Sequence, residues 1–142
     1  MRFVTIDSSV AVKWIFPERL HEQHMTHALQ LLKLIEHESI KIIQPVHWLV
    51  EVAAVVVRIQ PQISKRTIQF LEAMKFPIAD EIEIYHIACE LAERFNHHLF
   101  DTLYHAVAIY KNAQFITADE KYYKKTHKQG HVIRLADFSI FD

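Results

Sequence analysis

Short apolar runs rich in β-branched residues alternate along the chain with longer segments in which apolar residues recur every three or four positions. The short runs predict strands and the longer segments predict helices. The predicted strands are 3–6, 40–44, 76–79, 114–117 and 131–135, and the predicted helices are 8–15, 18–38, 46–59, 64–74, 81–96, 101–111 and 119–128. This alternation favours an α/β fold with a mostly parallel sheet and helices on both faces.

The length and composition fit a single globular domain spanning residues 1–142. Apolar residues make up 51% of the chain and charged residues 23%, which argues against a disordered or fibrous protein. Sixteen basic residues against seventeen acidic ones give a net charge of -1, so the chain has no overall basic field. Any binding to nucleic acid must therefore depend on a local patch.

The lone cysteine and the charge pattern indicate where the protein works. Cys89 lies among apolar residues at helical spacing, which predicts a small core residue and no disulfide. Charged residues interrupt every apolar run well before the ~18 residues of a membrane span, and the N-terminus lacks the pattern of a signal peptide. We expect a soluble, cytoplasmic protein that does not associate with membranes.

Four acidic residues occupy positions that suggest a shared site. Asp7 ends the first predicted strand, and Asp119 follows the strand 114–117 by one residue, so both belong to the same edge of a parallel sheet. Glu51 lies on the flank of the apolar stripe of its helix, and Asp101 opens a helix that is apolar on nearly all sides.

Each acid alone has a simpler explanation, because an aspartate before a helix is often an N-cap and a glutamate on a flank can reach water. Four carboxylates at one edge of a sheet, however, would repel one another and lose solvation. Carboxylate oxygens are the ligands that Mg²⁺ or Mn²⁺ prefers. The combination therefore predicts a divalent-metal site.

Four sequence segments carry these acids: "DSSVAVKWIFPE", "PVHWLVEVAA", "FDTLYHAVAI" and "FITADEKYYKK". In this order, with gaps of 44, 50 and 18 residues between the acids, they resemble the acidic motifs of PIN-domain ribonucleases. The resemblance is strongest to the VapC-type toxins of type II toxin–antitoxin modules, and it extends to about residue 125. It implies a three-layer α/β/α fold with a central, mostly parallel sheet.

The resemblance also implies an activity, a cofactor and partners. Asp7, Glu51, Asp101 and Asp119 would form the catalytic and metal-binding quartet, with Mg²⁺ or Mn²⁺ as the cofactor. Ser8 and Thr117 would orient carboxylates or waters beside the first and last acids. Such enzymes hydrolyse RNA phosphodiester bonds by attack of water, leave a 5′-phosphate, form homodimers, and are inhibited by a VapB-like antitoxin protein.

Histidines near the acids have two possible roles. His105 stands one turn after Asp101, and His47 stands one turn before Glu51, so either side chain can support an acid or contact RNA; the alternative is a hydrogen-bonded histidine beside the core. A further group, His21, His24 and His27, spreads over about 120° of a helix. That spacing favours a solvated face over a transition-metal site.

Basic residues near the last acid predict contacts with RNA. Lys121, Lys124 and Lys125, with two tyrosines between them, suit phosphate contacts and base stacking, although a solvated helix explains the same pattern. Lys13 is a further candidate for the substrate backbone. An antitoxin would need an apolar groove, for which Trp14, Ile15 and Phe16 are candidates, although burial in the core is the alternative.

Two other function classes remain open at this point. A catalytically silent PIN-like domain would bind RNA or protein without turnover. A phospho-receiver also gathers aspartates around Mg²⁺ at strand ends, but its pattern requires paired acids after the first strand, and here Asp7 is followed by Ser8 and Ser9. The sequence also argues against nucleotide-binding folds, because a glycine-rich phosphate loop cannot be written with Gly130 alone.

Overall fold

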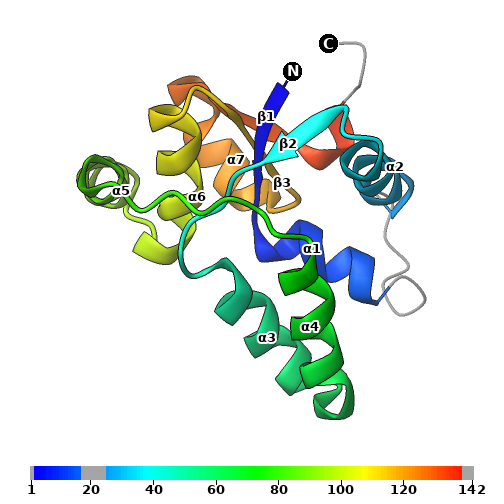
Figure 1. Ribbon diagram of the computed structural model, residues 1–142. Coiled ribbons are helices and arrows are strands. Elements are labelled where there is room, and N and C mark those ends of the chain that lie inside the picture. Colours follow the sequence, from blue (N-terminus) through cyan, green and yellow to red (C-terminus); the bar gives the residue numbers. More distant parts are fainter. Residues whose placement is uncertain (1, 17–24, 139–142) are drawn as a thin grey trace.

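A four-stranded parallel sheet forms the centre of the molecule (Figure 1). The computed structural model describes residues 2–16 and 25–138. The strands are β1 (Arg2–Ile6), β2 (Ile40–Ile42), β3 (Gln114–Thr117) and β4 (Val132–Arg134), and their order in the sheet is β2-β1-β3-β4. All three pairings are parallel, so the carboxyl ends of the strands share one edge.

Helices cover both faces of this sheet. They are α1 (Ser8–Ile15), α2 (Met25–Glu36), α3 (Trp48–Ile59), α4 (Ser64–Ala73), α5 (Ile82–Phe95), α6 (Leu99–Tyr110) and α7 (Glu120–Thr126), with 3₁₀ turns at Pro61–Ile63, His127–Gln129 and Leu135–Asp137. Figure 1 shows α5 and α6 on one side of the sheet, α2 on the other, and α3 with α4 projecting beyond the carboxyl ends of the strands. The predicted three-layer α/β/α architecture is confirmed.

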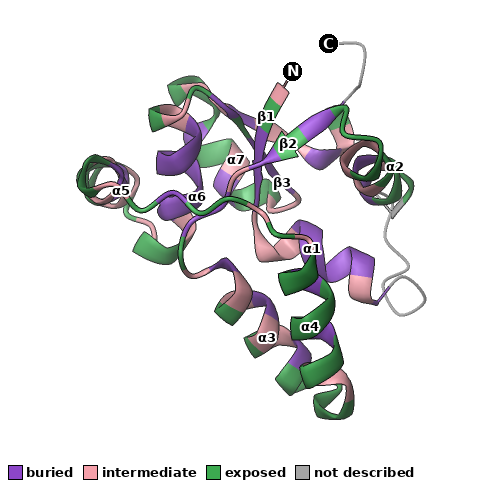
Figure 2. Cartoon of the chain, in the orientation of Figure 1, coloured by how far each residue is buried: buried purple, intermediate pink, exposed green. Residues whose placement is uncertain are grey.

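The core follows the apolar pattern of the sequence. The inner residues of β1 and β3, among them Ile6 and Ile116, are fully buried between the helical layers. Helix α6 packs against both strands, and every residue from Thr102 to Ala108 is buried (Figure 2). The prediction that this helix is enclosed on nearly all sides is therefore confirmed, and Asp101 in its first turn is carried by a rigid element.

At the C-terminal end of β1, the side chain of Gln44 makes the two backbone hydrogen bonds that a neighbouring strand would otherwise make. The buried amide of Gln44 donates from Nε2 to the carbonyl of Ile6 at 2.8 Å and accepts from the Ile6 amide at 3.0 Å. Both backbone groups just before Asp7 are thus satisfied where β2 has already ended. This pair of bonds fixes the backbone that presents Asp7.

Three details differ from the sequence predictions or complete them. The predicted strand 76–79 is wrong: only Ile78 forms an isolated parallel bridge, to Gln44, and Pro77 has no N–H with which to extend a ladder. Cys89 is exposed on α5, because the buried stripe of that helix runs through Ile84, Ala88 and Leu91. The turn before β3 uses Asn112 with φ 53, since asparagine tolerates the left-handed conformation that glycine usually supplies.

The remaining predicted elements agree closely with the structure. Residues 18–24 of the predicted helix 18–38 and the last residues of the chain, 139–142, lie outside the described part. Across residues 2–16 and 25–138, none of the helices combines the length and the apolar character that a membrane span requires.

Candidate active site

Asp7 and Asp119 meet at the carboxyl ends of β1 and β3. The backbone of Asp7 caps α1, but its side chain does not: it accepts hydrogen bonds from the hydroxyls of Ser9 and, at 2.7 Å, of Thr117. The same Thr117 hydroxyl accepts from the amide of Asp119 at 3.0 Å. Thr117 therefore links the first acid to the last, as the sequence prediction of an orienting role requires.

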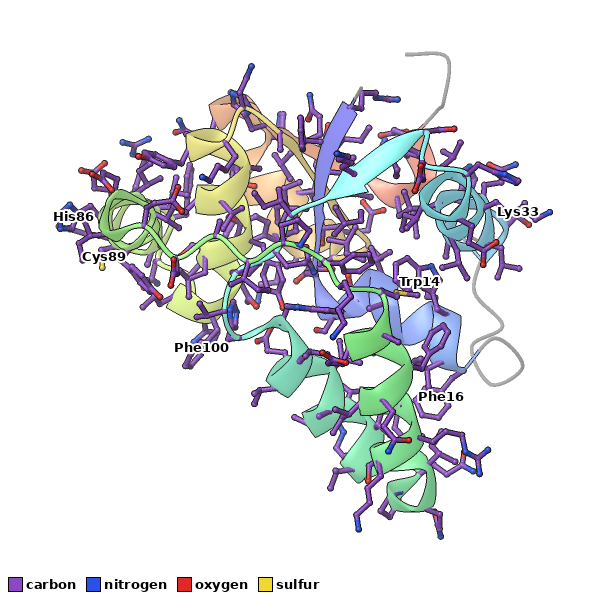
Figure 3. All side chains as sticks on the ribbon, viewed as in Figure 1. Trp14, Phe16, Lys33, His86, Cys89 and Phe100 are labelled. Carbon is purple, nitrogen blue, oxygen red and sulfur yellow. The ribbon has the colours of Figure 1, made fainter. Side chains whose placement is uncertain are left out.

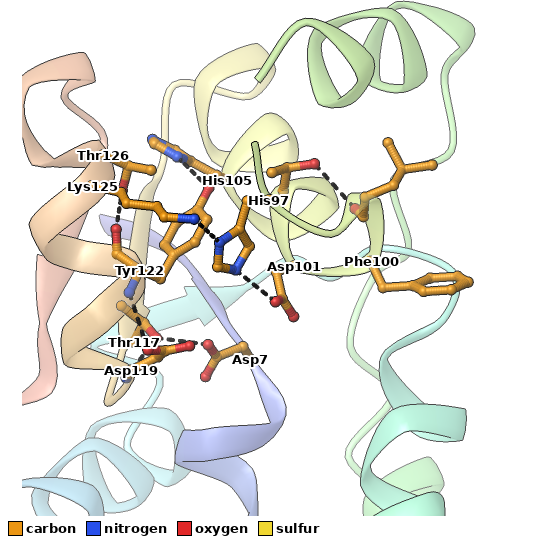
Figure 4. Close-up of polar contacts among 12 residues, drawn as sticks. Asp7, His97, Phe100, Asp101, His105, Thr117, Asp119, Tyr122, Lys125 and Thr126 are labelled. Carbon is orange, nitrogen blue, oxygen red and sulfur yellow. Dashed lines mark hydrogen bonds and ion pairs between the residues drawn. The ribbon is translucent and has the colours of Figure 1, made fainter. Parts of the chain in front are cut away.

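Asp119 both starts a helix and faces the site. Its Oδ1 accepts from the amide of Tyr122 at 3.0 Å, so its side chain caps α7. Its charge acts on Asp7, whose pKa it helps to raise (Figure 4). The hydroxyl beside Asp7 belongs to Ser9 rather than to Ser8, and it also accepts from the amide of Ala118 at 3.1 Å.

Asp101 is held by a histidine that the sequence prediction did not assign. Oδ2 of Asp101 lies 2.8 Å from Nε2 of His97, and Nδ1 of His97 lies 3.1 Å from Nζ of Lys125 (Figure 4). An ammonium group can only donate, so Nδ1 accepts and Nε2 carries the proton that it donates to Asp101. The left-handed residue Asn96, with φ 49, turns the chain so that His97 reaches back. Asp101 lies in the first turn of α6 and does not cap it.

Glu51 projects from α3 beside Tyr104 of α6. The hydroxyl of Tyr104 donates to Oε1 of Glu51 at 2.6 Å, and Nε2 of His47 lies 3.6 Å from the same oxygen. Nε2 of His47 also lies 2.7 Å from the carbonyl oxygen of Phe100. The prediction that His47 supports Glu51 is thus consistent with its position, and Tyr104 is an additional partner that the sequence reading missed.

The electrostatics of the acids show that they share one region. Burial raises the pKa of Asp7 from its ordinary 3.8 to about 6, and the charges of Asp101 and Asp119 add to the rise, while the hydrogen bonds from Ser9 and Thr117 oppose it. Burial also raises the pKa of Glu51, opposed by the Tyr104 hydrogen bond, and Asp101 again adds to the rise. The charge of Asp101 thus acts on both Asp7 and Glu51, and His47 opposes the rise at Glu51.

Comparison with known proteins identifies the fold and the family. The profile of the PIN domain matches residues 4–128. The chain belongs to the PIN domain family. A search of curated proteins found no match to the sequence.

Two solved structures resemble this PIN domain. One is described as a toxin–antitoxin complex from Klebsiella pneumoniae, with a TM-score of 0.68, 16% identity, and coverage of 93% of this chain and 97% of that chain. The other is described as VapBC2 from Rickettsia felis bound to a DNA fragment from its promoter, with a TM-score of 0.65, 16% identity, and coverage of 93% and 96%. At this identity the likeness concerns the fold.

The other predicted site residues of the PIN domain lie at different depths. His105 is fully buried, and its ring nitrogens lie 2.8 Å from the Tyr122 hydroxyl and 2.7 Å from the Gly130 carbonyl oxygen. Burial lowers the pKa of His105. It therefore supports the packing of α7 on α6 beneath the acids and touches none of them, which corresponds to the alternative of a histidine beside the core.

The predicted basic residues also separate. Lys13 is only 2% exposed, and burial lowers its pKa, so it lies inside the protein rather than on an open RNA-binding surface. Lys121, Lys124 and Lys125 are all exposed on α7. Of these, Lys121 and Lys125 line a pocket of about 250 Å³ that begins beside His97.

Proposed function

We propose that this PIN domain is a Mg²⁺- or Mn²⁺-dependent endoribonuclease and the toxin of a toxin–antitoxin pair. The observation that supports this most strongly is the raised pKa of Asp7, to which burial and the charges of Asp101 and Asp119 contribute. A carboxyl group whose pKa is strongly raised by burial and by neighbouring charges is typical of a functional site. The four-motif resemblance and membership of the PIN family point the same way.

The donor chemistry fits a hard divalent cation. Asp7, Glu51, Asp101 and Asp119 offer oxygen atoms only, which suits Mg²⁺ or Mn²⁺ and disfavours Zn²⁺. Within the described ranges, no three His, Cys, Asp or Glu side chains stand close enough together to form a ready-made metal centre. Mg²⁺ commonly keeps several of its waters and uses one or two carboxylates directly, so wider spacing agrees with a hydrated ion held partly through water.

The protein residues have distinct tasks in this proposal. A bound divalent cation supplies the positive charge that an anionic phosphodiester needs in order to approach the acids. Ser9 and Thr117 hold the Asp7 carboxylate in one orientation, as hydroxyl donors do for ligating carboxylates. His97 does the same for Asp101, and Tyr104 does so for Glu51. No side chain is required as a nucleophile, and hydrolysis by water leaves a 5′-phosphate on the downstream fragment.

An apolar groove offers a place for an antitoxin segment. Trp14, Ile15 and Phe70 line it together with Ile63, Arg66 and Thr67, and its volume is about 320 Å³. The Phe70 side chain is 47% exposed, whereas Phe16 is buried and does not line the groove. The proposed partner is VapB-like and places an apolar segment there. We expect a partner protein to copurify with the native chain at a one-to-one ratio. Phe70→Glu should abolish this copurification.

Homodimer formation belongs to the same proposal. Apolar side chains on α3 are exposed, including Val50 and Val57. Phe100 at the start of α6 is exposed as well (Figure 3). These residues are candidates for a contact between two copies in the cytoplasm, and light scattering on the purified protein tests it. A monomer at all concentrations would contradict the dimer while leaving the nuclease proposal unaffected.

The nuclease is tested by incubating purified protein, freed of any copurifying partner, with total RNA in EDTA, Mg²⁺ or Mn²⁺. Asp7→Asn serves as the inactive control, and the ends of the fragments are mapped. Discrete cuts that need metal, carry a 5′-phosphate and vanish in the variant support the proposal. Absence of cutting with either metal would shift the interpretation to a PIN domain that binds RNA or protein without turnover.

A further inference from the structure

A small basic pocket adjoins the acids on the side of α7. Asn96, His97 and His98 line it from the loop before α6, and Lys121 and Lys125 line it from α7. The two lysines are one turn apart on α7 and therefore lie on the same face of that helix. None of the described residues that line the pocket carries a carboxylate, and Asp101 lies on the other side of His97.

The hydrogen bonds of the two lysines leave donors for a ligand. Lys125 donates to the carbonyl of Asn96 at 3.1 Å and to Nδ1 of His97 at 3.1 Å, so one of the three ammonium protons is still available. Among the described residues, Lys121 takes part in none of the ion pairs. Two ammonium groups that line one pocket favour the binding of an anion there.

The pocket is also connected to Asp101. His97 contacts Lys125 through one ring nitrogen and Asp101 through the other. A group bound at Lys125 therefore lies two hydrogen bonds from an acid of the proposed active site. The size of the pocket, about 250 Å³, suits a phosphate group with part of its ribose and is too small for a folded segment of protein.

We infer that this pocket binds one phosphate of the RNA backbone next to the bond that is cut. Lys121 and Lys125 are the phosphate ligands. His97 is a positioning residue, because it is hydrogen-bonded to both Lys125 and Asp101. This inference rests on the proposed ribonuclease activity. It selects Lys121 and Lys125, and not Lys124, as the lysines of α7 that contact the RNA. A bound phosphate fixes the register of the RNA strand relative to the acids, because phosphate contacts set position along the backbone.

Binding is measured first, in a protein that does not cut. The affinity for a single-stranded RNA is measured in Mg²⁺ at several salt concentrations. Two proteins are compared: the Asp7→Asn variant, and the same variant that also carries Lys121→Gln and Lys125→Gln. The double change should weaken binding about tenfold, because charge-assisted hydrogen bonds to phosphate are lost. It should also reduce the slope of log K against log salt by about 0.7, the value for one phosphate contact on a single strand.

The control for loss of positive charge is Lys33→Gln, which removes one charge, against two in the double variant, from an exposed position on α2 that does not line the pocket (Figure 3). Thermal unfolding of all variants checks that they fold. Equal affinity for RNA in the double variant and in the Lys33→Gln control would overturn the inference, as would an Asp7→Asn variant that binds no RNA at all.

Position along the RNA is tested with the wild-type protein. Phosphates of a cleaved oligonucleotide are replaced one at a time by neutral methylphosphonates. Replacement of one phosphate beside the scissile bond should reduce cleavage about tenfold in the wild type. The same replacement should have no further effect in Lys121→Gln/Lys125→Gln, because the methylphosphonate and the lysine substitutions remove the same contact. Equal sensitivity at that position in both proteins would contradict the pocket, whereas failure of the wild type to cut any RNA would contradict the proposed function instead.

Discussion

The raised pKa of Asp7 predicts that the acid site destabilises the fold at neutral pH. Burial and the neighbouring charges raise the pKa from 3.8 to about 6. A rise of one pKa unit corresponds to about 1.36 kcal/mol, so the whole rise corresponds to about 3 kcal/mol of lost folding free energy when Asp7 is charged. The Asp7 side chain is only partly enclosed, and solvent screens part of the repulsion, which leaves about 1–2 kcal/mol as the expected cost.

Asp7→Asn removes this charge while keeping the shape of the side chain. Ser9 and Thr117 can still bond to the amide, since a hydroxyl donates to its oxygen and accepts from its nitrogen. In the absence of divalent metal at pH 7 the variant should therefore be more stable by about 1–2 kcal/mol, equal to a rise in melting temperature of about 3–6 °C. Activity should be lost in the same protein.

The pH dependence gives the sign of the effect. The folded protein holds the Asp7 proton more tightly than the unfolded chain, so between about pH 4 and pH 6 the wild type becomes more stable as the pH falls. The advantage of Asp7→Asn is then full above pH 6 and disappears by about pH 4. Thermal denaturation in EDTA across this range measures it, with the exposed Asp80→Asn as the matched control.

The reasoning would be refuted by Asp7→Asn that melts at or below the wild-type temperature at pH 7. A stability gain that stays constant down to pH 4 would also refute it, because a gain independent of pH does not come from the Asp7 charge.

Three further substitutions test individual supports of the site. Thr117→Val removes the hydroxyl between Asp7 and the Asp119 amide. We expect a loss of about 1 kcal/mol in urea unfolding, because a partly buried amide loses its partner, together with slower RNA cleavage. His97→Ala removes the donor to Asp101 and should reduce cleavage, and it should also lower the melting temperature, because the His97 side chain is only 9% exposed and its ring packs against Tyr122. The exposed His86→Ala should change neither quantity, and equal cleavage rates in the two variants would remove His97 from the site. Tyr104→Phe removes the hydrogen bond that lowers the pKa of Glu51, so the acidic limb of the pH–rate profile should move to higher pH; an unmoved limb would show that Glu51 ionisation does not limit the reaction.

The sequence predicted the fold well because the strands and helices carry strong periodic patterns. The strands that end just before Asp7 and Asp119 are short, rich in β-branched residues and mostly buried, and α6 is apolar on nearly all sides, so local pattern and tertiary burial agree. The segment 76–79 is apolar as well, but Pro77 cannot donate to a ladder, and only one bridge forms. An apolar run alone does not show whether a neighbouring strand is available to pair.

The sequence indicated how the four acids are placed relative to the sheet more closely than it indicated which side chains bond to them. Asp101 has a histidine four residues before it and another four residues after it, at the same spacing, and the sequence favoured His105. The structure buries His105 against Tyr122 and brings His97 to Asp101, because the left-handed turn at Asn96 reverses the chain there. That choice depends on the docking of α7 against α6, which local spacing does not contain. A similar limit separates Ser9 from Ser8, since the first turn of α1 decides which hydroxyl points back to Asp7.

The most direct test of the central claim is the metal dependence of cutting at a single RNA bond. The rate is measured on a defined oligonucleotide over a Mn²⁺ titration starting from EDTA, for the wild type and for Asp7→Asn, Glu51→Gln, Asp101→Asn and Asp119→Asn. The account predicts no cutting in EDTA, a rate that rises to saturation with Mn²⁺, and a large loss in each variant that remains folded. Cutting that persists in EDTA, or that survives in all four variants, would contradict a metal-dependent ribonuclease built on these acids.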